Sequence, residues 1–142
     1  MIEQNFTIEG AEQLLKENFA PWIQELCITF DKFGDGEAIL RVPVSERLNR
    51  EGGTICGQAI MAVADTAMVF AIISALNNFV PMTTVSQSSS FLRPAANKDL
   101  LAHASIIKLG RTLVYGEINI YTDGPEKPVA HVTSTNMLLG KL

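Results

Sequence analysis

Residues 57–77 read GQAIMAVADTAMVFAIISALN, and this stretch decides the fold. From 59 to 76 it is apolar except for Asp65, Thr66 and Ser74, which predicts a long helix that is apolar on all sides. A run of this length would also suit a membrane span. However, Asp65 would then lie near the bilayer centre, no Lys or Arg anchors either end, and Ala rather than Leu dominates. We therefore interpret it as a helix wrapped by protein.

Strand-like segments follow and precede this helix. A short amphipathic helix is expected at 10–19, ended by Pro21. The predicted strands are 25–33, 37–42, 83–92, 100–109, 112–122 and 128–139. Glycines around Asp35 indicate a hairpin between the first two strands. Because the connections are short, antiparallel meander pairing is the simplest topology.

These elements predict an α+β fold in one domain, residues 1–142. A curved antiparallel sheet of about six strands is the simplest way to bury a central helix that is apolar all round, since a flat sheet covers one face. The short N-terminal helix is packed alongside. A half-wrapped helix still leaves one side open, so we expect a second copy of the chain to cover it.

Composition excludes several classes of function. The chain has 142 residues and a net charge of −4, with no basic run of the kind that binds nucleic acid. Cys27 and Cys56 are far apart and lie in no Cys/His cluster with metal-ligand spacing, as expected for reduced thiols. The first residues, MIEQN, do not resemble a secretory signal. We expect a cytoplasmic protein without a membrane or nucleic-acid partner.

Asp65 is the residue that ordinary packing does not explain. Its neighbours at helical spacing are Met61, Met68, Val69 and Ile72. No Lys, Arg or His occurs between Arg50 and Arg93, so the local sequence supplies no counter-ion, and burying an unpaired carboxylate is costly. A distant Arg or contact with water would be a structural explanation. The functional interpretation is a catalytic carboxylate aimed into a cleft.

The start of the helix offers a second element of a site. Residues 52–57, GGTICG, lead into it, and free N–H groups at a helix N-terminus stabilise a developing oxyanion. The N–H of Gly57 would lie roughly 12 Å along the axis from Asp65, which is long for one carbonyl centre. This spacing suggests that Asp65 of one subunit works with the helix N-terminus of the other.

Residues 49–67, NREGGTICGQAIMAVADTA, resemble the motif of hotdog-fold thioesterases of the phenylacetate-pathway (PaaI) type. In that family an Asn, a Gly and His-Gly-Gly precede a helix that carries the catalytic Asp. Further matches occur at 83–84, 91–95, 108–111 and 129–133, so the resemblance covers about 48–139. It implies a hotdog fold, hydrolysis of acyl-CoA-type thioesters, and dimers that often pair into tetramers.

The resemblance also implies roles for individual residues. Asp65 matches the general base or nucleophile, and Gly57 matches the glycine whose N–H polarises the thioester carbonyl. Thr84, with Thr83 beside it, matches a Ser/Thr position that helps to place the water, usually from the partner subunit. Asn49 lies near the position of the family's asparagine that contacts the thioester, although the loop between it and the helix is one residue longer here. In addition, Arg93 and Arg111 are candidates for the phosphates of coenzyme A, which would lie along the dimer surface.

Two positions depart from the family motif. Cys56 stands where His is usual, and Gln58 stands where the second Gly is usual. Asp65, the expected base, is retained, but the two replacements bear on the geometry of the site and on its substrate preference. A thiolate nucleophile at Cys56 is disfavoured, because its two candidate partners, His103 and His131, lie on distant strands.

Two alternatives to a hydrolase stay open. An acyl-thioester hydratase of the same fold would usually pair its carboxylate with a His, which Cys56 replaces here. A non-catalytic module that binds acyl-CoA or acyl-carrier protein would have no use for Asp65. Hydrolysis needs an oriented water, a base and a polarised carbonyl, so we expect no metal or redox cofactor.

Overall fold

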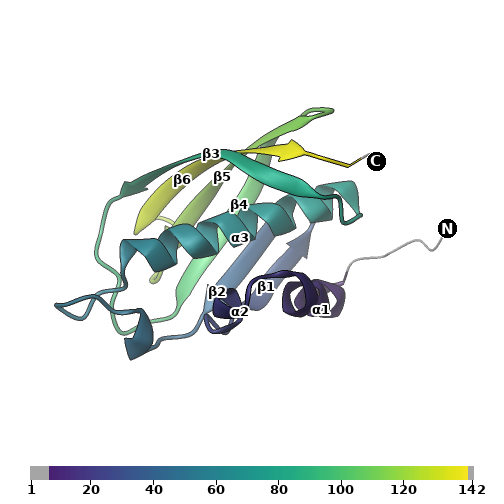
Figure 1. Ribbon diagram of the computed structural model, residues 1–142. Helices are drawn as coiled ribbons and strands as arrows, with labels where there is room; N and C mark the ends of the chain where they lie inside the picture. The colour runs from purple at the N-terminus through teal and green to yellow at the C-terminus, as the bar shows by residue number, and fades with distance from the viewer. Residues whose placement is uncertain (1–6, 141–142) are drawn as a thin grey trace.

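A computed structural model describes residues 7–140. It shows a curved antiparallel sheet folded around one long helix (Figure 1). The strands are β1 (Thr29–Gly34), β2 (Glu37–Val42), β3 (Met82–Phe91), β4 (Leu100–Leu109), β5 (Leu113–Tyr121) and β6 (Ala130–Leu138). The helices are α1 (Ile8–Asn18), α2 (Pro21–Gln24) and α3 (Gly57–Leu76), with a 3-10 turn η1 (Glu46–Leu48). This arrangement confirms the predicted α+β hotdog fold with its central helix and short N-terminal helix.

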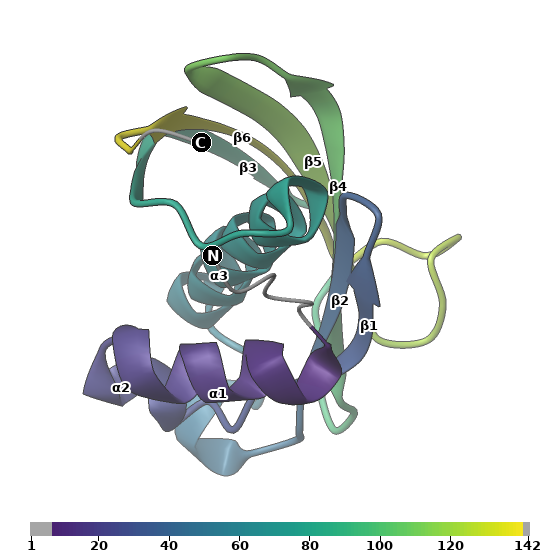
Figure 2. The same cartoon turned by 90° about the vertical axis from the view of Figure 1, so that its right-hand side faces the viewer.

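The order of the strands departs from a simple meander. They lie in the order β1-β2-β4-β5-β6-β3, so β3 pairs with β6 at one edge rather than with its sequence neighbours. The 20-residue helix α3 connects β2 to β3 in the sequence and lies in the concave face of the sheet, in contact with both strands. The chain therefore enters β3 at the far edge and must return to place β4 beside β2 (Figure 2). Pairing between sequence neighbours holds for the β1–β2 hairpin and for β4, β5 and β6.

The segment after Pro21 also differs from its prediction. Pro21 does not simply end the first helix: it begins the short helix α2, where a proline is favoured because its missing N–H is not needed. Residues 25–28, predicted as strand, lie outside β1 and include Cys27 with a positive φ of 55°. The helix α1 packs beside β1, and α2 lies farther from that strand (Figure 2).

The helix α3 packs into the hollow of the sheet over most of its circumference. It is long and apolar enough to span a membrane, but Phe70, Ile72 and Ile73 are fully buried against the sheet, which identifies it as the core helix. One stripe of α3 stays open in the protomer. We call it the open stripe: Gln58, Met61, Ala62, Asp65 and Val69. The prediction that one side of the helix is left uncovered is therefore confirmed.

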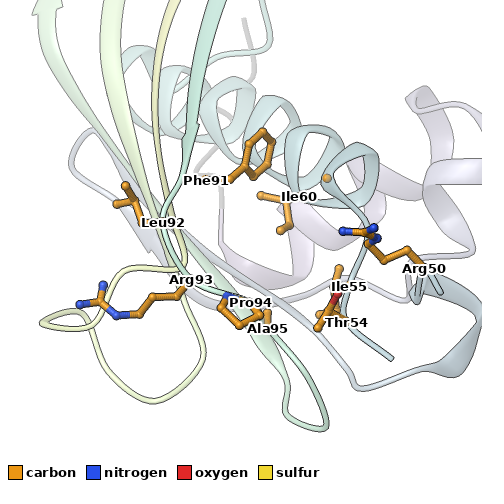
Figure 3. Close-up of a pocket in the computed structure, with 10 residues that line it drawn as sticks. Arg50, Thr54, Ile55, Ile60, Phe91, Leu92, Arg93, Pro94 and Ala95 are labelled. Atoms are coloured by element: carbon orange, nitrogen blue, oxygen red, sulfur yellow. The ribbon is translucent and has the colours of Figure 1, made fainter. Parts of the chain in front are cut away.

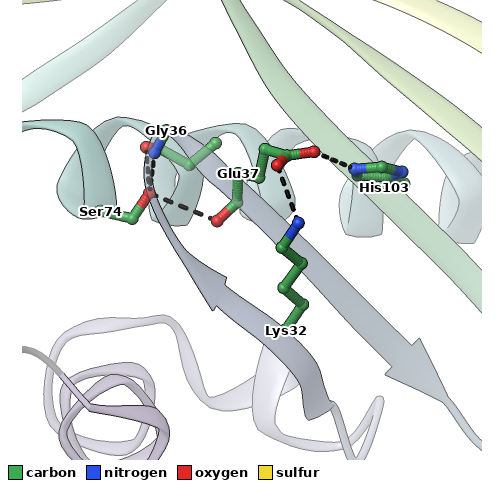
Figure 4. Close-up of polar contacts among 6 residues, drawn as sticks. Lys32, Gly36, Glu37, Ser74 and His103 are labelled. Atoms are coloured by element: carbon green, nitrogen blue, oxygen red, sulfur yellow. Dashed lines mark hydrogen bonds and ion pairs between the residues drawn. The ribbon is translucent and has the colours of Figure 1, made fainter.

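A polar cluster holds the β1–β2 hairpin to α3 (Figure 4). The Ser74 hydroxyl accepts a hydrogen bond from the N–H of Gly36 (3.0 Å) and lies 3.3 Å from the Glu37 carbonyl. The Glu37 carboxylate bonds Lys32 (2.8 Å) and His103 (2.7 Å). These bonds lower the pKa of the Glu37 carboxyl from its ordinary value, the Lys32 bond contributing most. The cluster fixes one end of the helix that carries Asp65.

Candidate active site

The helix α3 and the edge strand β3 run antiparallel and touch along their length. Near one end the Phe91 ring covers Gly57, where an added Cβ would lie 3.4 Å from the ring. In the middle, the Gln87 amide donates to the Met61 carbonyl (3.2 Å). We call this line of contacts the α3–β3 seam. It places residues that are far apart in the sequence in one row beside the open stripe.

The central contact of the seam joins the two residues predicted to act on the thioester. The Thr84 hydroxyl donates to Oδ1 of Asp65 over 2.7 Å. Asp65 is half-buried, and among the described residues it forms no ion pair. It is less buried than the sequence suggested because it belongs to the open stripe, whereas its neighbours Met68 and Ile72 face the sheet. The carboxylate is thus oriented by a hydroxyl and still accessible.

Thr84 bonds Asp65 of its own chain. The resemblance placed this Ser/Thr usually on the partner subunit, so here the hydroxyl and the carboxylate form one unit within a protomer. A β-bulge in β3 between Thr84 and Ser86 makes the arrangement possible. Because the bulge adds one residue, both Thr84 and Gln87 point toward α3, while Val85 is exposed. Thr83 is exposed and points away from the helix, so it does not join the pair.

Two buried polar residues of β6 extend this hydrogen-bond chain. The Asn136 side-chain amide donates through Nδ2 to the Thr84 hydroxyl (3.4 Å). The Ser134 hydroxyl donates to Oδ1 of Asn136 (3.0 Å). Asn136 is fully buried, so its bonds are strongly favoured over leaving the amide unpaired. Sequence analysis did not identify either residue. The available signal was the two-residue period of the strand, which places Ser134 and Asn136 on the same inner face as Ala130, Val132 and Leu138.

An open cavity of about 510 Å³ lies at the start of α3 (Figure 3). Its lining comes from the loop before α3, the first turns of α3 and the end of β3: Arg50, Thr54, Ile55, Gly57, Ile60, Phe91, Leu92, Arg93, Pro94 and Ala95. As the first residue of the helix, Gly57 has an N–H that no helical carbonyl can accept, and the helix dipole is positive there. The cavity therefore combines a free backbone donor with cationic side chains.

Arg50 is the cation that the loop before α3 contributes to this cavity. Figure 3 shows it extending across the cavity, whereas Arg93 extends outward, and the Arg93 guanidinium donates to the carbonyl of Pro128 (2.8 Å). Arg50 was not among the predicted site residues; its position one residue after Asn49 was the available signal. Arg111 lies in the turn before Leu113, at the opposite end of the sheet from Arg93. One phosphate therefore cannot contact Arg93 and Arg111 of the same protomer.

The loop before α3 is a tight turn that fixes Asn49. Asn49 forms an isolated bridge with Ile55, and the N–H of Arg50 donates to the Thr54 carbonyl (2.8 Å). The loop closes through Gly52 and Gly53, whose φ angles of +97° and +81° favour glycine. Asn49 is half-buried close to the helix start.

Cys56 and Gln58 face a different hollow from Gly57. The hollow is also lined by residues of α2, the segment after it, η1 and α3: Trp22, Glu25, Leu26, Arg47, Leu48 and Ala59. The two histidines considered as partners of Cys56 are engaged elsewhere, His103 with Glu37 (2.7 Å) and His131 with Glu117 (3.0 Å). This arrangement does not support a Cys–His pair. Residues 7–140 also contain no group of three His, Cys, Asp or Glu side chains that could hold a metal ion.

The comparison with known proteins identifies the family. A model of the thioesterase superfamily matches residues 52–129, more than half of the chain. The chain belongs to this superfamily. The match begins just before α3 and includes Gly57, Asp65 and Thr84. It therefore covers the whole α3–β3 seam.

Similar proteins agree with this assignment. A protein of Halobacterium salinarum, named as a candidate esterase, is 35% identical over 102 residues, which cover 68% of this chain and 67% of that protein. A solved structure from Silicibacter sp. TM1040, described as a candidate thioesterase, is 35% identical with a TM-score of 0.83 and covers 96% of this chain and 94% of its own. These similarities indicate a hydrolase.

The PaaI protein of the Escherichia coli phenylacetic acid degradation operon is a further structural neighbour. It superimposes with a TM-score of 0.82 over 97% of both chains. At 21% identity this likeness shows the fold alone. Together with the superfamily match, it confirms the resemblance to PaaI-type hotdog thioesterases.

Proposed function

We propose that the protein hydrolyses acyl-CoA-type thioesters to the free acid and coenzyme A, with Asp65 as the catalytic carboxylate. One observation carries this proposal: in a thioesterase-superfamily fold, a half-buried Asp65 on the open stripe is held by the Thr84 hydroxyl at 2.7 Å. The bond leaves Oδ2 of Asp65 available. The carboxylate either takes a proton from the attacking water or attacks the carbonyl itself.

The thioester carbonyl is polarised by the N–H of Gly57 in this proposal. The first N–H of α3 and the positive end of its dipole are suited to a developing oxyanion. Gly57 and Asp65 of one chain are eight residues apart, roughly 12 Å along the helix, so one carbonyl cannot contact both. Asp65 and Thr84 of one protomer therefore act with Gly57 and Asn49 of a partner copy.

A homodimer with antiparallel α3 helices supplies this combination. The open stripe and the edge strand β3 lie side by side, and β3 presents unpaired backbone groups and the exposed Val85 at the sheet edge. A second copy that pairs along β3 covers both features and brings the start of its α3 toward Asp65. Two such dimers pair further into a tetramer.

Coenzyme A is then bound at the cavity before α3. Arg50 is the best-placed partner for a phosphate, and Arg93 and Arg111 contribute from different protomers. Cys56 and Gln58 line the neighbouring hollow, and Thr83 lies on the outer side of β3. The reaction needs no metal or redox cofactor, because a base, a water and a backbone donor suffice. We place this activity in the cytoplasm.

A panel of acyl-CoA esters tests the proposal. Thiol release is followed with a chromogenic reagent, and binding of each ester is measured in parallel by calorimetry. Turnover of at least one ester supports a hydrolase. Binding without turnover on any ester would instead indicate a non-catalytic acyl-CoA binding module. A hydratase would consume an unsaturated ester without releasing thiol; the engagement of both histidines with glutamates argues against it.

A further inference from the structure

An apolar hollow lies beside the α3–β3 seam, at the opposite end from the cavity with Arg50. Its volume is about 280 Å³. It is lined by residues from the end of α1, the middle of α3, the start of β3 and the C-terminal segment: Asn18, Phe19, Val69, Phe79, Val80, Pro81, Met82 and Leu139. No lining residue is charged, and Asn18 is the one with a polar side chain.

The hollow lies next to the Asp65–Thr84 pair along the seam. Val69 lies one turn beyond Asp65 on the open stripe, about 6 Å along the helix axis. Met82 lies two residues before Thr84 on the same side of β3, about 7 Å along the strand. Because the helix and the strand run antiparallel, both steps lead in the same direction and end in this hollow. A group attached to a carbonyl at Asp65 can therefore enter it directly.

The walls of the hollow are fixed by contacts outside it. The Phe19 ring stacks on Phe70 with 5.3 Å between ring centroids, and Phe70 is fully buried in the core. The N–H of Leu139 donates to the carbonyl of Pro81 (2.7 Å), which holds the C-terminal segment against the start of β3. A preformed apolar site of this kind binds a ligand without a large cost for ordering its walls.

We propose that this hollow receives the acyl group of the substrate, and that the substrates are thioesters of uncharged apolar acids of medium size. This inference rests on the proposed function. The volume falls just below the range of sites for drug-sized ligands, so a long fatty acyl chain would exceed it. An acyl group that ends in a carboxylate would lose its hydration there without gaining a partner.

Chain-length dependence provides the first test. With acetyl-, butyryl-, hexanoyl- and octanoyl-CoA, we expect kcat/KM to rise about fourfold per methylene, the factor that corresponds to about 0.8 kcal/mol of transfer free energy. The rise should stop once the hollow is filled, and palmitoyl- and succinyl-CoA should be poor substrates. Equal kcat/KM for acetyl- and octanoyl-CoA, or a best substrate with a charged acyl group, would overturn the assignment.

Substitutions in the hollow provide the second test. Val69→Phe reduces its volume and should lower kcat/KM at least tenfold more for octanoyl-CoA than for acetyl-CoA, which moves the optimum to shorter chains. Phe79→Ala opens its mouth and should shift the optimum to longer chains, which keeps the assignment testable if Val69→Phe folds poorly. Val44→Phe is the matched control, because Val44 is exposed and lies outside the hollow.

The outcomes separate this assignment from the proposed function. If the unmodified protein releases thiol but Val69→Phe and Phe79→Ala leave the chain-length profile unchanged, the acyl site lies elsewhere and the hydrolase stands. If no ester of the panel is hydrolysed, the proposed function fails, and the acyl assignment fails with it.

Discussion

The Thr84 hydroxyl donates to the Asp65 carboxylate over 2.7 Å and thereby joins the open side of α3 to the edge strand β3. The hydroxyl has one proton, and it gives that proton to the carboxylate while accepting a hydrogen bond from Asn136 (3.4 Å). The hydrogen bonds therefore run in a fixed direction, from the buried Asn136 through Thr84 toward the accessible Asp65. Such a chain limits the carboxylate to one orientation.

Removing the Thr84 hydroxyl should lower kcat more than it raises KM. Thr84→Val keeps the shape of the side chain and releases Asp65 from its orientation, and misplacement of a reacting group costs about 100-fold in rate. Steady-state kinetics with a hydrolysed acyl-CoA ester measure the effect. Thr83→Val is the control, because Thr83 points away from α3. Equal kinetics for the two variants would contradict a role of Thr84.

Asn136 should support both stability and turnover. Asn136→Leu keeps a similar volume but leaves the Ser134 hydroxyl without its acceptor, which costs about 1–3 kcal/mol for a buried polar group. Urea denaturation measures this cost, and kcat measured well below the midpoint should also fall because Thr84 loses a partner. Ser134→Ala keeps the Asn136–Thr84 bond and should reduce kcat less. A variant with lower stability and unchanged kcat would assign Asn136 a structural role only.

Replacing Gly57 with proline should remove the polarising N–H without breaking α3. Proline is favoured at the first helical position, and Cys56 before it has the extended ψ of 150° that proline requires. We expect kcat to fall about 100- to 1,000-fold, as for loss of an oxyanion donor, with unchanged far-UV circular dichroism.

The same variant tests whether two protomers share each site. Mixing Gly57→Pro with Asp65→Asn after unfolding and refolding should restore about one quarter of the original activity, because half of the dimers are mixed and one of their two sites is intact. No recovery in the mixture, with mixed dimers demonstrated by mass spectrometry, would show that each site is built from one chain.

The pH dependence of stability should report the Glu37 cluster. The pKa of the Glu37 carboxyl is lowered, chiefly by the hydrogen bond from Lys32 and then by His103. A lowered pKa means that the ionised form is favoured by folding, so its contribution is present above the ordinary value and lost as the pH falls through the folded-state value. The difference in Tm between the unmodified protein and Glu37→Gln should therefore shrink between about pH 5 and pH 3. Glu51→Gln is the control, and a difference that grows on acidification would contradict the assignment.

The sequence predicted the elements of the fold better than their connections. The strand 100–109 and the helix from Gly57 follow directly from hydrophobic periodicity, which is a local property. The position of β3 at the far edge depends on how α3 packs against the sheet, which no strand pattern contains. For the same reason the bulge after Thr84, which decides the direction of its side chain, could not be predicted.

The candidate site divides in the same way. Asp65 stood out because a carboxylate in an apolar helix is costly, and Gly57 because it begins that helix. Asn136 has no distinguishing pattern in the sequence of its strand, and only the pairing of β6 with β3 brings it next to Thr84. The separation of Arg93 from Arg111 likewise follows from the strand order and not from their residue types.

Hydrolysis by Asp65→Asn under single-turnover conditions tests the central claim most directly. The amide keeps the size of the side chain but can neither take a proton from water nor attack the carbonyl. We predict that thiol release from an ester hydrolysed by the unmodified protein falls at least about 1,000-fold, while the ester binds with an unchanged Kd. Thiol release by Asp65→Asn at the rate of the unmodified protein would contradict the assignment of Asp65 as the catalytic carboxylate.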